Sequence, residues 1–104
     1  MISQLRKCFL ENRVLYTQHA RDEMRSEELG PIREEVFEAV QTGEVIESYE
    51  DDKPYPSALV YGRTSRDRPI HLVCAYAEEE DMAIVITVYE PDPSRWIDYR
   101  RRRQ

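Results

Sequence analysis

The sequence predicts an α+β domain in which N-terminal helices cover one face of a four-stranded antiparallel sheet. Apolar residues recur at helical spacing as far as about Thr42, and at the spacing of a strand beyond Gly43. The chain has 104 residues, which suits one domain over residues 1–104 with a basic C-terminal tail at residues 95–104. We therefore expect one core, between the helices and the sheet.

Three helices are expected before the sheet. The first spans residues 2–12, where residues of apolar character recur on one face at Ile2, Leu5, Cys8 and Phe9. The second begins after Thr17, whose hydroxyl can cap a helix N-terminus, and runs to about residue 28. Pro31 opens the third helix, because the first turn tolerates a missing N–H, and Gly43 follows its end.

Four strands are expected beyond Gly43. Their ranges are residues 44–50, 57–64, 68–76 and 82–90. Two prolines within residues 51–56 remove donors from a strand ladder and indicate a turn. Strands joined by tight turns pair as antiparallel neighbours, so their order in the sheet should follow their order in the chain.

Alternation of side chains in the last two strands separates a core face from a second face. In the earlier strand the core face holds Ile70, Leu72, Cys74 and Tyr76. In the final strand it is expected to hold Ile84, Ile86 and Val88. Burial of these apolar faces leaves a ring nitrogen, a hydroxyl and a phenol on the other side of the sheet, from His71, Thr87 and Tyr89.

The short turn after Thr64 sets the cross-strand neighbour of His71. If this turn is symmetric about residue 66, Tyr61 lies directly opposite His71. Tyr61 and Arg63 then join the polar group on the helix-free face, whereas a shift of one residue would scatter it. The titratable and cationic groups on this face are candidate site residues.

Five short motifs follow one another along the chain: Thr17-Gln-His-Ala20, Gly43-Glu-Val-Ile-Glu47, Lys53-Pro-Tyr-Pro-Ser57, Pro69-Ile-His-Leu-Val73 and Ile86-Thr-Val-Tyr-Glu-Pro91. In this order they resemble a family of small bacterial proteins known as domain of unknown function 4258 (DUF4258), from Tyr16 onward. The resemblance implies a RelE-type or barnase-like fold, and the activity of a small ribonuclease toxin of a toxin–antitoxin system. It also implies a zinc-finger-type antitoxin protein as partner.

RNA cleavage without a metal needs a base for the ribose 2′-hydroxyl, an acid for the leaving oxygen, and cations near the phosphate. We expect His71 to be the base or the acid, with Tyr89 or Tyr61 as proton donor or stacking surface. Arg63 is expected to neutralise phosphate charge, and Thr87 to position a phosphate oxygen. Ordinary roles in the sheet stay open for all five residues.

His19 is a further candidate catalytic residue near the start of the second helix. The helix dipole there favours a neutral ring that can accept a proton, whereas Glu23, one turn later, favours the charged ring. Hydrogen bonding of His19 to the backbone or to a carboxylate is the structural alternative. Many members of the DUF4258 family have an arginine where this chain has Glu23. The resemblance therefore does not imply a phosphate contact at this position.

Charge is distributed unevenly along the chain. The tail holds five arginines against Asp98, a net +4, which leaves −10 on the remainder of a chain with net charge −6. An acidic body repels nucleic acid, whereas the arginines supply local attraction to RNA or to an acidic partner. A solvated, frayed terminus is the alternative for the tail. Trp96 is expected as a hydrophobic lid over a sheet edge.

Several classes of protein are not favoured. No glycine-rich phosphate loop and no Cys or His cluster with zinc spacing is present, so we expect no metal and no cofactor. Neither a membrane span nor a signal peptide is recognisable. Cys8 and Cys74 fall on predicted buried faces, which suits free thiols in a reducing cytoplasm.

The leading hypothesis is a cytoplasmic toxin-like endoribonuclease of the mRNA interferase type, acting on RNA alone or on the ribosome. The alternative is a non-catalytic protein-binding module of the same fold. The charge of −10 outside the tail favours this alternative, because a ribonuclease benefits from a positive field.

Overall fold

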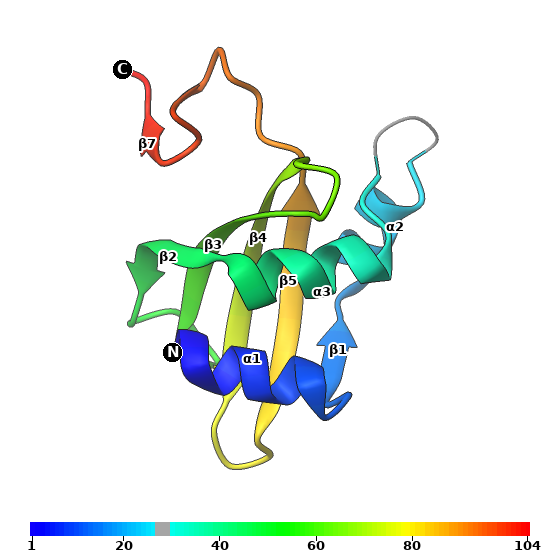
Figure 1. Cartoon of the computed structure of the whole chain (residues 1–104). Coiled ribbons are helices and arrows are strands. Elements are labelled where there is room, and N and C mark those ends of the chain that lie inside the picture. The colour runs from blue at the N-terminus through cyan, green and yellow to red at the C-terminus, as the bar shows by residue number, and fades with distance from the viewer. Residues whose placement is uncertain (27–29) are drawn as a thin grey trace.

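Three helices lie on one face of a five-stranded sheet, and a small hairpin follows the last long strand (Figure 1). The structure is a computed structural model that describes residues 1–26 and 30–104. The predicted α+β class is therefore confirmed, whereas the main sheet has five strands instead of the predicted four, and the two-stranded hairpin was not predicted. None of the helices in the described ranges is long and apolar enough to cross a lipid bilayer.

The helices are α1 (Ile2–Leu10), α2 (Gln18–Met24) and α3 (Arg33–Thr42). The first is shorter than predicted because the chain turns at Asn12, whose φ is 57°, to enter a strand. Thr17 caps α2 as predicted, since its Oγ1 accepts a hydrogen bond from the backbone N–H of Ala20 at 3.1 Å. The helix ends at Met24, before the predicted end near residue 28, which lies outside the described residues.

The sheet has the order β1-β5-β4-β3-β2. The four predicted strands form an antiparallel meander of β2 (Glu44–Tyr49), β3 (Ser57–Arg63), β4 (Pro69–Ala77) and β5 (Met82–Tyr89). The additional strand β1 (Val14–Tyr16) pairs in parallel with β5. Three residues are too few to show a period of two, so sequence reasoning missed β1.

The register around His71 agrees with the sequence prediction. Tyr61 lies directly opposite His71, which confirms a turn symmetric about residue 66. The prediction for β5 was wrong in part, because the strand contains a bulge: Thr87 pairs with Val73, but the next pair joins Val85 to Cys74. As a result Ala83, Val85 and Val88 enter the core, whereas Ile84 and Ile86 are only half-buried.

Helix and sheet approach each other closely where α3 crosses β3. A Cβ atom on Gly62 would lie 2.0 Å from the backbone oxygen of Ala39, so only glycine permits this approach. Val36, Val40 and Ala39 of α3 are all fully buried there. This contact holds α3 against the face of the sheet that Ile70 and Leu72 also enter.

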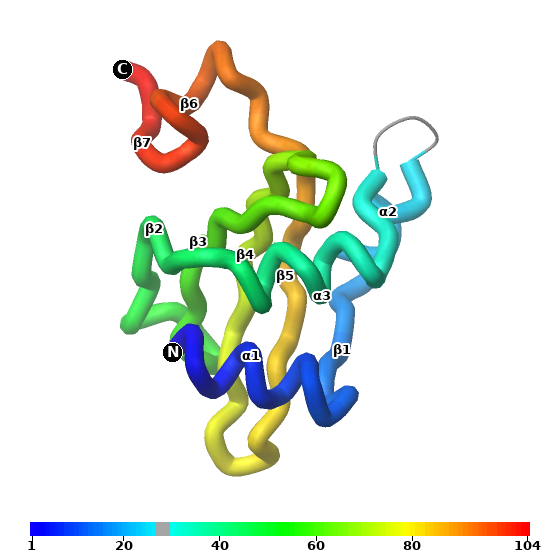
Figure 2. The backbone as a smooth tube through the Cα atoms, in the orientation of Figure 1, coloured from blue at the N-terminus to red at the C-terminus, as the bar shows by residue number. Residues whose placement is uncertain are grey.

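The C-terminal tail turns back on itself rather than fraying (Figure 2), and its arginines contact the sheet. It contains a hairpin of β6 (Trp96–Ile97) and β7 (Arg101–Arg102), which we call the C-terminal hairpin. Arg100 forms an ion pair with Glu44, and Arg102 forms a bidentate pair with Glu47, at 2.8 and 3.1 Å. Both carboxylates belong to β2, which is an edge strand of the sheet. The two ion pairs therefore hold the tail against a strand that is distant from it in sequence.

Candidate functional site

Three rings lie in one row across the sheet, on the face away from the helices. Tyr61, His71 and Tyr89 are directly opposite one another on β3, β4 and β5. The ring centroid of His71 lies 5.7 Å from that of Tyr61 and 5.4 Å from that of Tyr89, both in edge-on contact. Because β4 alternates, this row occupies the face opposite Ile70 and Leu72.

This face is free of helices, as predicted, but it is not open to solvent at His71, whose exposed fraction is 0%. It is the C-terminal hairpin, not the helical layer, that covers the ring, and Trp96 packs edge-on against it at 4.5 Å. The Nδ1 atom of His71 lies 3.2 Å from the hydroxyl of Tyr89, and Nε2 lies 2.6 Å from the backbone oxygen of Tyr99. Both ring nitrogens are therefore engaged.

These contacts define which nitrogen carries the proton. A carbonyl oxygen only accepts, so the Nε2 atom of His71 donates to Tyr99. Burial lowers the pKa of His71, against the opposing effect of the Tyr99 carbonyl, and favours a neutral ring at pH 7. In the neutral ring Nδ1 accepts, so the hydroxyl of Tyr89 donates to it. Burial also raises the pKa of Tyr89, which keeps the phenol protonated.

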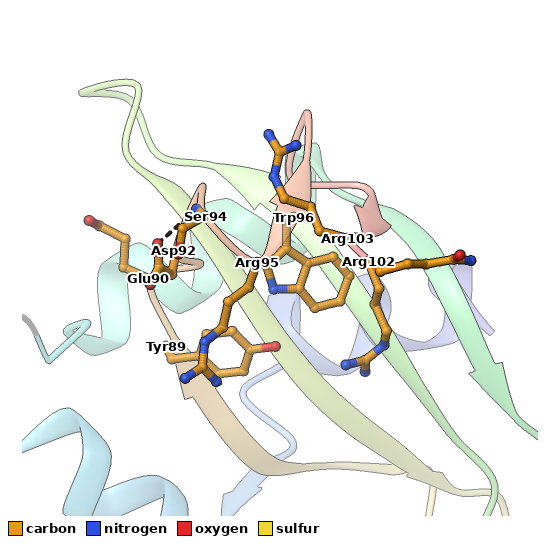
Figure 3. A pocket seen from close by; sticks show the side chains of 9 residues that line it. Tyr89, Glu90, Asp92, Ser94, Arg95, Trp96, Arg102 and Arg103 are labelled. Atoms are coloured by element: carbon orange, nitrogen blue, oxygen red, sulfur yellow. Dashed lines mark hydrogen bonds between the residues drawn. The ribbon is translucent and has the colours of Figure 1, made fainter.

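Tyr89 is half-buried and connects the buried imidazole to a surface pocket of about 680 Å³. The other side chains that line it are Glu90, Asp92, Ser94, Arg95, Trp96, Arg102, Arg103 and Gln104. Figure 3 shows the three arginines around the indole of Trp96. Arg102 lies over that indole at 4.7 Å, and Arg103 donates to the backbone oxygen of Pro93. The pocket thus presents a phenol and guanidinium groups together.

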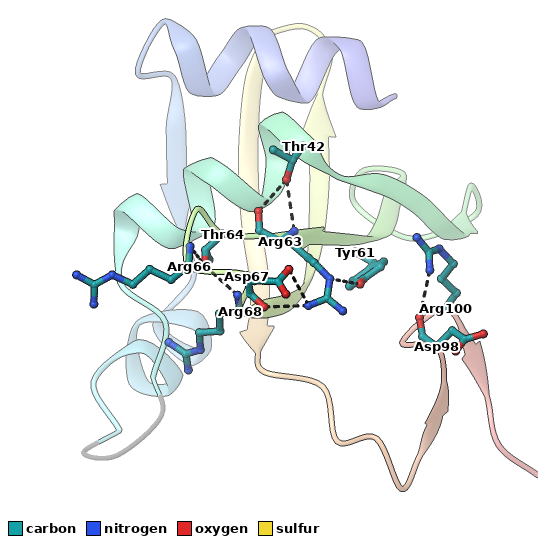
Figure 4. A network of polar contacts seen from close by, with 9 residues as sticks. All are labelled: Thr42, Tyr61, Arg63, Thr64, Arg66, Asp67, Arg68, Asp98 and Arg100. Atoms are coloured by element: carbon teal, nitrogen blue, oxygen red, sulfur yellow. Dashed lines mark hydrogen bonds and ion pairs between the residues drawn. The ribbon is translucent and has the colours of Figure 1, made fainter.

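Arg63 and Tyr61 are brought together, as expected, but in a different pocket. The Nε atom of Arg63 donates to the hydroxyl of Tyr61 at 2.9 Å, and Nη1 pairs with Asp67 at 3.1 Å (Figure 4). Arg100 lies over the Tyr61 ring at 5.0 Å from its centroid. Tyr61, Arg63 and Arg100 line a small pocket of about 240 Å³, and Tyr61 itself is only 5% exposed.

Thr87 and His19 lie apart from the histidine row, beside Glu23 of α2. Thr87 Oγ1 donates to Glu23 Oε1 at 2.5 Å, and the backbone N–H of Val88 donates to the same oxygen at 3.0 Å. The Glu23 carboxylate therefore accepts hydrogen bonds from the part of β5 that lies past its pairing with β1. His19 Nε2 lies 3.4 Å from this oxygen with its side chain 70% exposed, an arrangement that agrees with the structural alternative for His19.

Sequence reasoning missed the contributions of the C-terminal hairpin. Trp96 is a lid, but over His71 in the middle of the row rather than over a sheet edge. The carbonyl of Tyr99 has no signature in the sequence, because every residue has one. The clustering of arginines was visible, but not that Arg95 and Arg102 line a pocket with Tyr89. Among residues 1–26 and 30–104, no group of three or more His, Cys, Asp or Glu side chains could hold a metal ion.

These features define a small α+β domain whose sheet carries a buried histidine, hydrogen-bonded to a half-buried tyrosine, beneath a basic hairpin. The chain belongs to the family described as Domain of unknown function (DUF4258), whose model matches residues 16–90. No curated protein and no solved structure matches the chain. The family match includes His71 and Tyr89 and ends before the tail that covers them.

Proposed function

We propose that this protein is a toxin-like ribonuclease that cleaves RNA without a metal ion, at the pocket where Tyr89 meets the arginines of the tail. One observation carries the proposal: the phenol of Tyr89, hydrogen-bonded to a buried neutral imidazole, lines a pocket that also contains Arg95, Arg102 and Arg103. An acid–base pair and cations in one pocket are what phosphodiester transfer requires.

The proposed reaction is an internal transfer at phosphorus. The ribose 2′-oxygen attacks the adjacent phosphate, forms a 2′,3′-cyclic phosphate, and expels the 5′-oxygen of the next nucleotide. The 2′-hydroxyl proton passes to the oxygen of Tyr89 while the phenol proton passes to Nδ1 of His71. The leaving 5′-oxygen takes a proton from solvent. Tyr89 is the catalytic residue, and His71 acts through it because the buried ring cannot touch the substrate.

The cations have distinct parts in this scheme. Arg102 is already neutralised by Glu47, whereas Arg95 has no ion pair within the described part of the chain. We therefore assign Arg95 to the scissile phosphate, where its planar donors match two oxygens at once. Arg63 and Arg100 line the smaller pocket in ion pairs with Asp67 and Glu44, so a flanking phosphate bound there would have to displace a carboxylate. His19 and Thr87 have no part, because both face Glu23.

The test is cleavage of RNA by purified protein, alone and with ribosomes. We expect products that end in a cyclic phosphate, and a loss of roughly 100-fold in rate for Tyr89→Phe. Tyr55→Phe is the matched control, because Tyr55 lies in the turn between β2 and β3, away from the pocket. Intact RNA under both conditions, or equal rates for the two variants, would contradict the proposal.

We further propose, from the family resemblance, that the protein acts in the cytoplasm and is neutralised by a zinc-finger-type antitoxin. Growth arrest on induced expression, relieved by Tyr89→Phe and by co-expression of the partner, is the expected result. The rival role is a non-catalytic protein-binding module, which the acidic body favours. Arg102 is paired with Glu47, and Arg95 and Arg103 balance Glu90 and Asp92, so the pocket at Tyr89 is not acidic. This supports RNA as the ligand.

A further inference from the structure

The turn of the C-terminal hairpin has an unusual backbone. Asp98 and Tyr99, its two central residues, both have positive φ, at 52° and 60°. The N–H of Arg100 donates to the oxygen of Ile97 at 3.0 Å across the turn. These are the features of a type I′ turn, which glycine and asparagine adopt most readily. A tyrosine at this position is conformationally disfavoured, so contacts elsewhere must hold the turn in place.

Those contacts come from both sides of the hairpin. Arg100 and Arg102 pair with Glu44 and Glu47 of β2, and Trp96 packs against His71. Seated in this way, the turn presents the carbonyl oxygen of Tyr99 to Nε2 of His71 at 2.6 Å. No other hydrogen bond to Nε2 exists within the described residues. The state of the imidazole thus depends on one backbone carbonyl from the tail.

We propose that the C-terminal hairpin is a positioning element: the carbonyl of Tyr99 keeps the proton of His71 on Nε2, so that Nδ1 alone accepts the proton of Tyr89. The proposal places part of the site outside residues 16–90, the range matched by the family model. Use of this pair in RNA cleavage rests on the proposed function, whereas the state of the imidazole does not.

The groups that surround the imidazole are consistent with this role. Titratable or charged side chains face it from four strands: Glu47 of β2, Tyr61 of β3, Tyr89 of β5 and Arg102 of β7. The turn contributes the carbonyl of Tyr99, whose own ring packs against Tyr61. Glu47 favours the charged ring and Arg102 opposes it, and these two side chains are paired with each other. Their opposed effects leave the two hydrogen bonds to decide where the single proton lies.

Two substitutions at one position test the proposal. Tyr99→Gly and Tyr99→Pro both remove the phenol, but glycine accepts a φ of 60° freely whereas the ring of proline forbids it. The carbonyl therefore stays in place in the first variant and moves in the second. The measurement is the ¹⁵N spectrum of the His71 ring, together with the slowly exchanging proton on Nε2.

We expect wild-type protein and Tyr99→Gly to show one protonated and one unprotonated ring nitrogen, with the Nε2 proton visible. Tyr99→Pro should show averaged nitrogen shifts and no such proton. Arg102→Gln, which loosens the hairpin without changing its turn, should show an intermediate spectrum and provides the test if Tyr99→Pro does not fold. A wild-type spectrum in both Tyr99→Pro and Arg102→Gln, or equal loss in Tyr99→Gly and Tyr99→Pro, would overturn the proposal.

RNA cleavage by the same variants separates this inference from the proposed function. If the role of the hairpin and the proposed ribonuclease function are both correct, Tyr99→Pro cleaves at least about tenfold more slowly than Tyr99→Gly. If the spectra change as expected but no variant cleaves RNA, the ribonuclease proposal fails and the role of the hairpin stands. If Tyr99→Pro cleaves as fast as Tyr99→Gly while its imidazole changes state, the hairpin has no role in the chemistry.

Discussion

At the scale of single residues, the most consequential group is a histidine kept neutral by its surroundings. His71 is fully buried, and both ring nitrogens have partners, so the fold tolerates a polar ring inside it. An imidazolium at this position would lack the hydration it has in the unfolded chain. Burial is the main reason that the pKa of His71 lies below its ordinary value, and this links protonation to stability.

The linkage predicts that the protein loses stability as the solution becomes mildly acidic. Below pH 6.5, the ordinary histidine pKa, the unfolded chain takes up a proton at His71 while the folded chain does not. The free energy of unfolding therefore falls as the pH drops from about 7.5 to 5. Urea denaturation at several pH values measures it, and His71→Gln should have the shallower dependence. His19→Gln, which leaves the contribution of His71 in place, is the control; equal slopes for both variants would contradict the prediction.

A second residue with a defined role is Glu23. Its carboxylate accepts from the hydroxyl of Thr87 and from the N–H of Val88, both at the edge of β5. Glu23→Ala leaves these donors without their partner, and we expect a loss of about 2 kcal/mol in the free energy of unfolding. His19→Ala removes only an exposed contact to the same carboxylate and should cost less than about 0.5 kcal/mol. Thermal denaturation of both variants gives the comparison; equal losses would show that the edge contacts contribute nothing.

At the scale of secondary-structure elements, the close approach of α3 to β3 fixes the helical layer. Gly62 meets the backbone of Ala39, which cannot move aside as a flexible side chain would. The same strand carries Tyr61 on its other face. The helix α3 and the row of rings therefore lie on opposite faces of the sheet, with only the sheet between them. The position of the helix and the position of the site are thus set by neighbouring residues of one strand.

Gly62→Ala tests this arrangement. The added methyl group would lie 2.0 Å from the oxygen of Ala39, so helix and strand must separate. We expect a loss of roughly 1–3 kcal/mol, the usual cost of overfilling a packed core. Ala58→Gly, a change of the same size in the same strand, serves as a comparison because it removes a methyl group instead of adding one. A melting temperature unchanged by Gly62→Ala would contradict the close approach.

At the scale of the whole molecule, the uneven distribution of charge is partly neutralised within the fold. The tail brings a net charge of +4 to a body of −10, and two of its arginines are paired with glutamates of β2. Of the other three, Arg95 and Arg103 line the pocket at Tyr89. An acidic protein can in this way hold a local cationic surface, although its long-range field repels polyanions.

This distribution predicts that RNA binding depends only weakly on salt concentration. It also predicts that this dependence comes from the arginines around the pocket at Tyr89. Arg95→Gln should lower the slope of log binding constant against log salt concentration by about 0.7, the value for one phosphate contact on a single strand. Arg66, exposed in the turn between β3 and β4, provides the control, and Arg66→Gln should leave the slope unchanged. Fluorescence anisotropy with a labelled oligonucleotide measures both. Equal slopes for Arg95→Gln and wild type would contradict the assignment of Arg95.

The sequence was sufficient for the parts of this arrangement that depend on local pattern. The pairing of Tyr61 with His71 could be predicted because a short turn leaves few registers. The bulge at Ile86 could not, because an inserted residue leaves no mark in an alternating run of apolar side chains. The seating of the tail could not either, since Arg102 and its partner Glu47 are 55 residues apart and nothing local specifies that contact.

The edge-on contact between Trp96 and His71 has a practical consequence. Trp96 is the one tryptophan in the chain, and its indole lies 4.5 Å from the imidazole. Its fluorescence emission therefore reports on a single place in the molecule. A red shift towards the emission of a hydrated indole would mark departure of the tail, and quenching would mark a charged ring beneath it. The protein carries an intrinsic optical sensor for the state of its own candidate site, readable in real time without any label.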